Sequence, residues 1–260
     1  MPTTFFGWVG KLVQDNAALF LRGTGTTLLI ALSGTILGFV LGLLVAIART
    51  IQLPAGASKG KRLLVRALKA VLGVYIEVFR GTPMIVQAAV IYYGLQSVQV
   101  ALSHMVAGVL VVSINTGAYM AEIIRGGIIS IDKGQTEAAH AIGMTHWQTM
   151  TGVVLPQAIR NIMPSIGNEF VVNIKDSSVL NVISVSELFF MGKSAAGTYY
   201  RYFEAYFIIA LIYLVLTFTV TRLLRFLEKK MDGPDNYVIY GSQSDSRAEI
   251  HVHGGGKEAV

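Results

Sequence analysis

The 260-residue chain contains no cysteine, and charged side chains make up only 14% of it. Without cysteine the protein forms no disulfide bonds and offers no thiolate for catalysis or metal binding. Soluble domains carry roughly 25% charged residues, whereas 53% of this chain is hydrophobic and its mean hydropathy is +0.58. The composition therefore favours an integral membrane protein over a soluble enzyme.

The chain also lacks a Walker A sequence, the glycine-rich loop that binds nucleotide phosphates. Gly192-Lys193-Ser194 matches the end of that motif, but Glu187 stands where its first glycine is required. We therefore expect no ATP binding, no cofactor and no catalytic residue. We also expect no metal site, because His251 and His253 have no further ligands grouped with them.

The formal net charge of +6 at first suggests nucleic acid as a partner. The basic residues, however, cluster just beyond long apolar stretches, as the positive-inside rule describes for cytoplasmic loops of membrane proteins. The sequence therefore predicts contact with membrane lipid and no nucleic-acid binding.

About five apolar stretches reach the roughly 20 residues that a membrane-spanning helix needs. The predicted spans are residues 24–48, 70–96, 105–129, 162–185 and 206–224. The linker 49–69 is basic, and the outer loops 97–104 and 186–201 carry few basic residues. This distribution places the N-terminus outside and the C-terminus in the cytoplasm. The predicted fold class is an all-α integral membrane protein.

Three regions are expected along the chain. Residues 1–22 form an N-terminal segment whose moderately amphipathic part, 5–20, is suited to lie along the membrane surface. Residues 23–230 form the transmembrane domain. Residues 231–260 are polar and glycine-rich, which predicts a disordered cytoplasmic tail.

Small residues are spaced regularly in the first predicted span. Gly34, Gly38 and Gly42 form a Gly-x-x-x-Gly ladder. Such a ladder lets a second helix approach closely, because no side chain separates the backbones. We therefore expect tight helix packing on this face.

A polar segment, residues 133–156, separates the third and fourth predicted spans. It reads Glu-Ala-Ala, three residues, Gly, nine residues, Val, one residue, Leu-Pro. The positions of this pattern are Glu137, Ala138, Ala139, Gly143, Val153, Leu155 and Pro156. Alanine and glutamate favour helix, Gly143 permits a turn after it, and Pro156 is expected to end the helix leading to it. We predict a narrow helix over 135–147 that fits a socket on a partner; an ordinary amphipathic connector is the alternative.

This segment resembles the EAA loop of ABC importer permeases, with valine at position 153 in place of isoleucine. In that family the loop is a cytoplasmic helix that docks into a groove on the ATPase subunit. Three further segments resemble motifs of polar amino acid importer permeases, the histidine, arginine and glutamine group. They are Phe79-Arg80-Gly81-Thr82-Pro83 with Gln87, the stretch from Asn115 to Gly127, and Gly167-Asn168-Glu169-Phe170 followed by Lys175-Asp176-Ser177-Ser178. At position 116 the family more often has serine than threonine.

The resemblance covers residues 23–230 and implies the type I ABC importer permease fold, with 133–156 as the coupling loop. It implies a bacterial inner-membrane complex of two permeases, two ATPase subunits that use ATP and Mg²⁺, and an extracytoplasmic amino-acid-binding protein. The chain itself is then the permease and not an enzyme.

Polar side chains within the predicted spans are the candidate substrate contacts, because such groups are costly in a membrane and usually functional. Glu169, beside Asn168, can pair with the ammonium group of an amino acid or with a neighbouring helix. Related permeases have their substrate site in this region. Asn115, Thr116 and Tyr119 lie in the third predicted span, and Asn115 and Tyr119, four residues apart, share a helix face. These three residues either line the pathway or form hydrogen bonds between helices.

Other residues are expected to have structural or gating roles. Pro83 favours a kink that frees a backbone carbonyl, and Arg80 is suited to bind that carbonyl, a carboxylate or the substrate, with the structural role preferred. Glu122 and Arg125 are three apart and predict an ion pair near the inner end of their helix.

Lys175 and Asp176 are adjacent and point about 100° apart on a helix. A local pair and a pair with a partner subunit both remain open for them.

The function expected from these features is ATP-driven import of a polar or basic amino acid, such as arginine, histidine, lysine or glutamine, by alternating access. An ion-coupled secondary transporter with Glu169 as its ion site is the alternative, although the chain lacks the internal repeat common in that class. An intramembrane enzyme is disfavoured because no nucleophile–base pair is evident. The exact substrate, and whether the permease pairs with itself or a paralogue, stay open.

Overall fold

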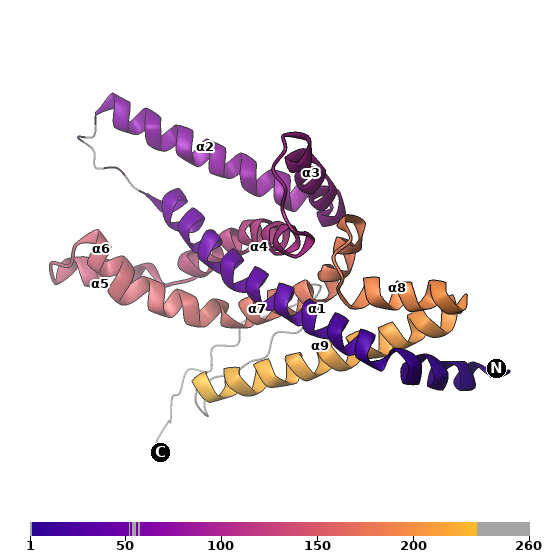
Figure 1. The fold of residues 1–260 in the computed structure, drawn as a ribbon. Coiled ribbons are helices and arrows are strands. Elements are labelled where there is room, and N and C mark those ends of the chain that lie inside the picture. The colour runs from indigo at the N-terminus through magenta and orange to yellow at the C-terminus, as the bar shows by residue number, and fades with distance from the viewer. Residues whose placement is uncertain (1, 52, 54–55, 57, 233–260) are drawn as a thin grey trace, which may run out of the picture.

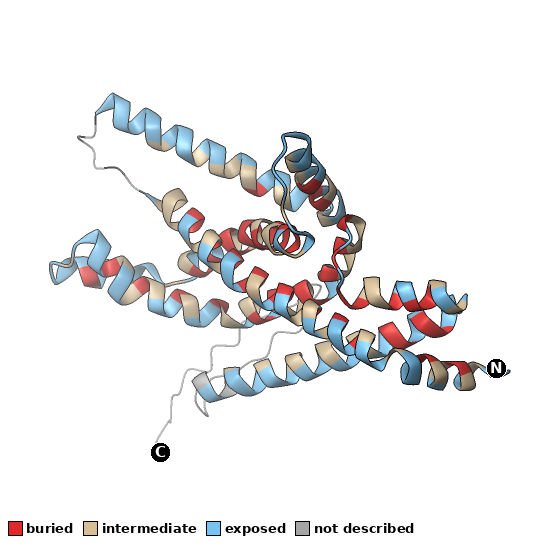
Figure 2. Ribbon diagram, viewed as in Figure 1, coloured by how far each residue is buried: buried red, intermediate tan, exposed pale blue. Residues whose placement is uncertain are grey.

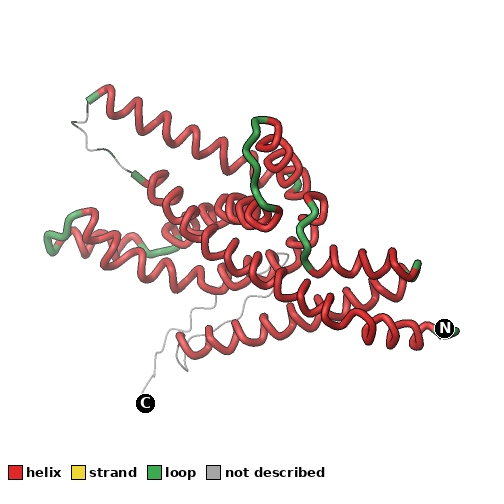
Figure 3. The backbone as a smooth tube through the Cα atoms, viewed as in Figure 1, coloured by secondary structure: helices red, strands yellow, loops and turns green. Residues whose placement is uncertain are grey.

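The computed structural model describes residues 2–51, 53, 56 and 58–232, and within them every regular element is a helix (Figures 1 and 3). The elements are α1 (Phe5–Thr50), α2 (Lys59–Gly81), α3 (Met84–Ser97), α4 (His104–Ile129), α5 (Lys133–Ala141), α6 (His146–Thr149), the π-helix η1 (Met150–Val154), α7 (Leu155–Asp176), the 3₁₀-helix η2 (Ser177–Ile183), α8 (Leu188–Tyr199) and α9 (Tyr202–Asp232). The all-α class is confirmed. The predicted tail lies, from residue 233 onward, outside the described residues.

Three described helices, α1, α4 and α9, are long and apolar enough to cross a membrane. The helical segment from α6 to η2 and the helix α8 meet at a bend of 55°, and together they form a fourth candidate span. These match four of the five predicted spans. The second predicted span, 70–96, is instead divided between α2 and α3, because Thr82 and Pro83 are extended (φ/ψ −121/148 and −65/135). The sequence predicted a kink at Pro83, and the structure shows a complete break.

The N-terminal segment is continuous with the first span. Asn16 has a non-helical backbone (φ −121, ψ 16) and marks a kink inside α1, so the change of direction lies before the predicted boundary at residue 22. Trp8, Leu12 and Phe20 are buried, and the last two pack with the apolar faces of α8 and α9. The start of α1 therefore packs against this helical pair, at the opposite side of the view from α5 and α6 (Figure 1).

The predicted outer loop 186–201 is for the most part a helix, α8. Glu187 caps this helix by accepting hydrogen bonds from the backbone N–H groups of Phe189 (2.8 Å) and Phe190 (2.7 Å). A capping carboxylate followed by apolar residues is a helix-start signal that the low charge of the segment concealed. Tyr213 of α9 also donates a hydrogen bond to Glu187 (2.9 Å), which fixes α8 against α9.

The glycine ladder lies in a close helix contact, and it confirms the predicted close approach. A Cβ atom added at Gly34, Gly38 or Gly42 would lie 2.4, 2.7 or 2.5 Å from side-chain atoms of α4, which belong to Val112, Thr116 and Met120. The partner helix is therefore α4. The red, buried residues concentrate along α1 and α4, whereas α2 and α9 are largely exposed (Figure 2).

Candidate functional site

The polar segment between α4 and α7 forms an exposed helical hairpin. Asp132 caps α5 by accepting a hydrogen bond from the N–H of Gly134 (2.6 Å). The helix ends at Ala141, and Gly143 then adopts φ +84, a left-handed conformation that favours glycine. A capping box between Thr145 and Gln148 starts α6. The predicted turn at Gly143 is confirmed, but the helix predicted over 135–147 is two short helices joined by that turn.

The hairpin presents both polar and apolar groups to its surroundings. Glu137 and Ala138 are exposed and Ala139 is buried. Ile142 and Trp147 are 80% and 67% exposed. Neighbouring large apolar side chains that are exposed are typical of a surface that a partner covers.

The sequence predicted that Pro156 ends the helix leading to it, and this prediction is wrong. Pro156 lies in the first turn of α7, which follows η1 and α6 without an intervening loop, and it is exposed, while Leu155 beside it is half-buried. The wider hydrogen-bond spacing of the π-helix η1 leaves room for a proline, which lacks a backbone donor. The Leu-Pro pair therefore marks the entry into α7.

The break between α2 and α3 is closed by two side-chain amides. The Gln87 Nε2 group donates to the carbonyl oxygens of Phe79 (2.9 Å) and Thr82 (2.9 Å). Asn115 of α4 donates to the same Phe79 carbonyl (3.2 Å) and to Gln87 Oε1 (2.9 Å). The freed carbonyls are therefore bound by Gln87 and Asn115. The guanidinium of Arg80, for which a carbonyl was one of three candidate partners, does not bind them.

A second buried chain of hydrogen bonds joins α1, α4 and α7. Thr116 donates to Asn173 Oδ1 (3.1 Å), and Asn173 Nδ2 donates to Thr35 Oγ1 (2.8 Å). All three side chains are buried. The sequence reasoning missed Asn173, although its spacing of four from Glu169 places both on one helix face. For Asn115 and Thr116 the structure thus shows the interhelical bonds of the alternative interpretation.

Glu169, Arg80 and Tyr119 form a separate group contributed by α7, α2 and α4. Glu169 is 6% exposed, and none of the described residues donates a hydrogen bond to its carboxylate. Arg80 is exposed, and its guanidinium lies over the ring of the half-buried Tyr119, 5.6 Å from the ring centroid. Arg80 and Asp176 are both close enough to interact electrostatically with Glu169.

Asn168 does not share this environment. It is exposed, whereas the adjacent Glu169 is buried. Lys175 is exposed and Asp176 half-buried, and in the described part of the chain no ion pair joins them. The two side chains interact electrostatically without forming a direct ion pair.

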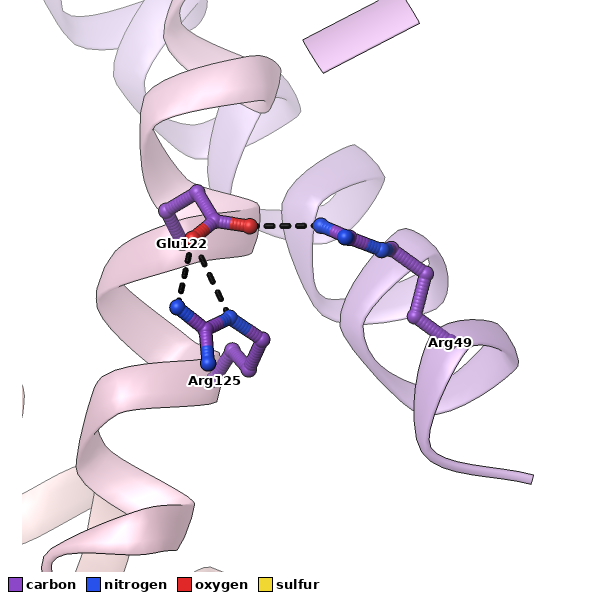
Figure 4. Close-up of polar contacts among 3 residues, drawn as sticks. All are labelled: Arg49, Glu122 and Arg125. Atoms are coloured by element: carbon purple, nitrogen blue, oxygen red, sulfur yellow. Dashed lines mark hydrogen bonds and ion pairs between the residues drawn. The ribbon is translucent and has the colours of Figure 1, made fainter. Parts of the chain in front are cut away.

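The predicted Glu122–Arg125 pair is present and has a third member (Figure 4). Arg125 binds Glu122 Oε2 through Nε (3.1 Å) and Nη2 (2.8 Å). Arg49, from the end of α1, binds Glu122 Oε1 (2.5 Å). One carboxylate thus clamps α1 to α4, and Arg49 was missed because its partner lies 73 residues away in the sequence.

Comparison with known proteins agrees with this architecture. Residues 38–233 match the sequence profile of the family described as binding-protein-dependent transport system inner membrane component. The glutamine transport system permease protein GlnP of Escherichia coli (strain K12) is 37% identical over 228 residues, which cover 87% of this chain and 98% of GlnP. The probable glutamine ABC transporter permease protein GlnM of Bacillus subtilis (strain 168) is 34% identical, covering 85% and 97%.

A solved structure supports the same conclusion at the level of the fold. The crystal structure of an amino acid ABC transporter with histidines matches with a TM-score of 0.76 and 38% identity, covering 88% of this chain and 100% of that one. The chain therefore belongs to the binding-protein-dependent transport system inner membrane component family and is the permease subunit, not the ATPase, of an amino acid ABC transporter.

Proposed function

We propose that this permease forms the translocation pathway for a polar or basic amino acid and binds it between Glu169 and Arg80. The observation that carries the proposal is a buried carboxylate that receives no hydrogen bond from the described residues. A largely buried carboxylate that receives no hydrogen bond is costly. A substrate ammonium group would supply that partner.

The charges around Glu169 match an amino acid with a basic side chain. Glu169 is suited to the α-ammonium group, and the Arg80 guanidinium, held over Tyr119, is suited to the α-carboxylate, which it can bind through two parallel hydrogen bonds. Asp176 adds a second negative charge near Glu169. Asp176 is suited to the side-chain cation of arginine, lysine or protonated histidine, while the neighbouring Lys175 partly offsets its charge, so glutamine remains within the polar range.

We further propose that the hairpin of α5 and α6 couples this pathway to the ATPase. Its exposed Ile142 and Trp147 would enter an apolar groove on that subunit, and the turn at Gly143 sets their positions. The start of α2, α5 with α6 and the far end of α9 lie toward one side of Figure 1, and the N-terminus and α8 toward the other. This arrangement supports a cytoplasmic hairpin, an outside N-terminus and a cytoplasmic C-terminus.

The complete importer would contain two ATPase subunits, a second permease and an extracytoplasmic amino-acid-binding protein. ATP binding would close the ATPase dimer, and α5 and α6 would transmit this movement so that the pathway opens to the outside. Substrate transfer then depends on a difference in affinity between the two states.

The test is uptake of radiolabelled arginine, lysine, histidine and glutamine by the complex reconstituted in liposomes with its binding protein. Removing the charge with Glu169→Gln should weaken substrate binding roughly tenfold to hundredfold, the range for a hydrogen bond to a charged group. Glu204→Gln is the matched control, since Glu204 is also buried but lies on α9 beside Arg201. Unchanged uptake kinetics in Glu169→Gln, with the complex intact, would remove Glu169 from the site.

A further inference from the structure

The first half of α2 is strongly basic and projects from the helix bundle (Figure 1). Residues 59–69 contain five basic residues and no acidic one. The basic residues are Lys59, Lys61, Arg62, Arg66 and Lys69. Ile76, near the other end, is the residue of α2 that is buried, so the whole basic half packs against no described core (Figure 2).

Four of these residues share one face of the helix. At about 100° per residue, Lys59, Arg62, Arg66 and Lys69 fall within an arc of about 80°. We name these four residues the basic stripe. Lys61 lies about 80° or more outside the arc. The stripe is thus a property of the helix and not of the linker composition alone.

The face opposite the basic stripe is apolar and also exposed. Leu64, Leu68 and Val71 are spaced by four and three residues, and their exposed fractions are 70%, 40% and 66%. A helix with a basic face and an exposed apolar face is typical of segments that lie in the membrane interface. In water these three side chains would have no cover among the described residues.

The basic stripe is positioned at the inner end of the first span. Lys69 donates a hydrogen bond from Nζ to the carbonyl of Ile51 (2.7 Å), the residue that follows α1. Arg49 lies two residues before Ile51. The stripe therefore begins where α1 leaves the bilayer and extends from there along α2.

We propose that the first half of α2 lies in the cytoplasmic interface of the bilayer and binds anionic phospholipids. The apolar face of Leu64, Leu68 and Val71 enters the boundary of the acyl chains, and the basic stripe binds the headgroup phosphates. A bilayer fits better than a soluble protein partner, because one anionic surface covers the exposed apolar face of Leu64, Leu68 and Val71 and lies against the basic stripe at the same time. This inference rests on the membrane location of the chain and on the cytoplasmic side proposed above for the start of α2, and it is independent of the proposed substrate site.

The first test is a lipid titration of the detergent-purified transporter complex by native mass spectrometry, with phosphatidylglycerol and phosphatidylcholine as probes. Each basic residue near an anionic surface contributes roughly a fivefold change in affinity. Arg66→Gln should weaken phosphatidylglycerol binding about fivefold and Lys59→Gln/Arg66→Gln about 25-fold. The control Lys61→Gln removes the same charge outside the stripe and should have the smaller effect. Phosphatidylcholine binding should not change.

The second test uses the absence of cysteine from this chain, which allows the purified permease to be labelled at a single introduced cysteine before the complex is assembled. A fluorophore on Leu64→Cys in the reconstituted complex should be quenched by lipids carrying a spin label in the acyl chain, whereas one on Lys59→Cys should respond to aqueous iodide. If both labels respond only to iodide, α2 projects into the cytosol and the proposal fails.

Two further outcomes would overturn the proposal. If inorganic phosphate displaces phosphatidylglycerol as well as unlabelled lipid does, the stripe is a phosphate site and not a lipid surface. If Lys59→Gln/Arg66→Gln releases the ATPase subunit while lipid binding is unchanged, the surface belongs to that protein. Both outcomes are separate from Glu169, whose variant should bind lipid like the wild type.

Discussion

The contact between α1 and α4 allows a quantitative test at Gly38. An alanine there would place its Cβ 2.7 Å from Thr116 Cβ, 2.8 Å from Thr116 Cγ2 and 3.2 Å from the nitrogen of Gly117. Ordinary contacts between such atoms need about 3.5 Å or more. The helices must therefore separate by several tenths of an ångström, because a backbone and a β-branched residue cannot move aside by a rotamer change.

The magnitude follows from two effects. Overpacking a well-packed contact costs about 1–3 kcal/mol. Separation also lengthens the bond from Thr116 to Asn173, now 3.1 Å, and an interhelical hydrogen bond in a membrane contributes about 0.6 kcal/mol. Helix propensity opposes this by up to about 1 kcal/mol, since alanine favours helix over glycine. We expect Gly38→Ala to lower the free energy of unfolding by about 1–3 kcal/mol.

The assay is equilibrium unfolding of the purified permease by sodium dodecyl sulfate, followed by circular dichroism. Gly25→Ala is the control, because Gly25 lies in the same helix and a Cβ there meets nothing within 4 Å. It gains the same helix propensity without the clash, so the difference between the two variants isolates packing. If Gly38→Ala is as stable as Gly25→Ala, the close approach of α1 and α4 is refuted.

Two further predictions concern the hairpin and the α2–α3 break. Gly143→Asp should reduce both co-purification of the ATPase and amino acid uptake, because φ +84 disfavours a side chain and the added charge adjoins the exposed Ile142. Normal association and uptake would contradict the coupling role. Unfolding curves equal to those of the wild type serve as the control for folding. Gln87→Leu should destabilise the permease by about 1–3 kcal/mol, because the Thr82 carbonyl loses its donor while Asn115 still donates to the carbonyl of Phe79. The exposed Gln96→Leu is its control in the detergent assay, and equal losses would show that the amide of Gln87 does not hold the break together.

Features set by neighbouring residues could be predicted from the sequence. The glycine ladder, the Glu122–Arg125 pair and the turn at Gly143 each depend on spacings of three or four residues or on one backbone preference. The residues that were missed have partners far along the chain: Asn173 binds Thr116 across 57 positions. No periodicity within one helix identifies such a partner, because tertiary packing decides which helices meet.

Local rules also gave wrong results where two preferences competed. Pro156 was expected to end a helix, but a proline in a first helical turn has no hydrogen bond to lose, and the preceding π-helix accommodates it. The low number of basic residues in 186–201 favoured an outer loop, but the Glu187 carboxylate caps a helix there.

The glycine ladder also constrains how the transporter moves. Val112, Thr116 and Met120 of α4 pack directly against the glycine backbone of α1, so no second layer of side chains can rearrange between the helices, and α1 and α4 cannot slide past each other in small steps. The clamp of Arg49 and Arg125 on Glu122 adds a fixed point at one end of the same pair. We expect α1 and α4 to travel as one stiff strut during each transport cycle. The hinges must then lie elsewhere, at Thr82–Pro83 and at Ser184, where φ is +60 just before α8.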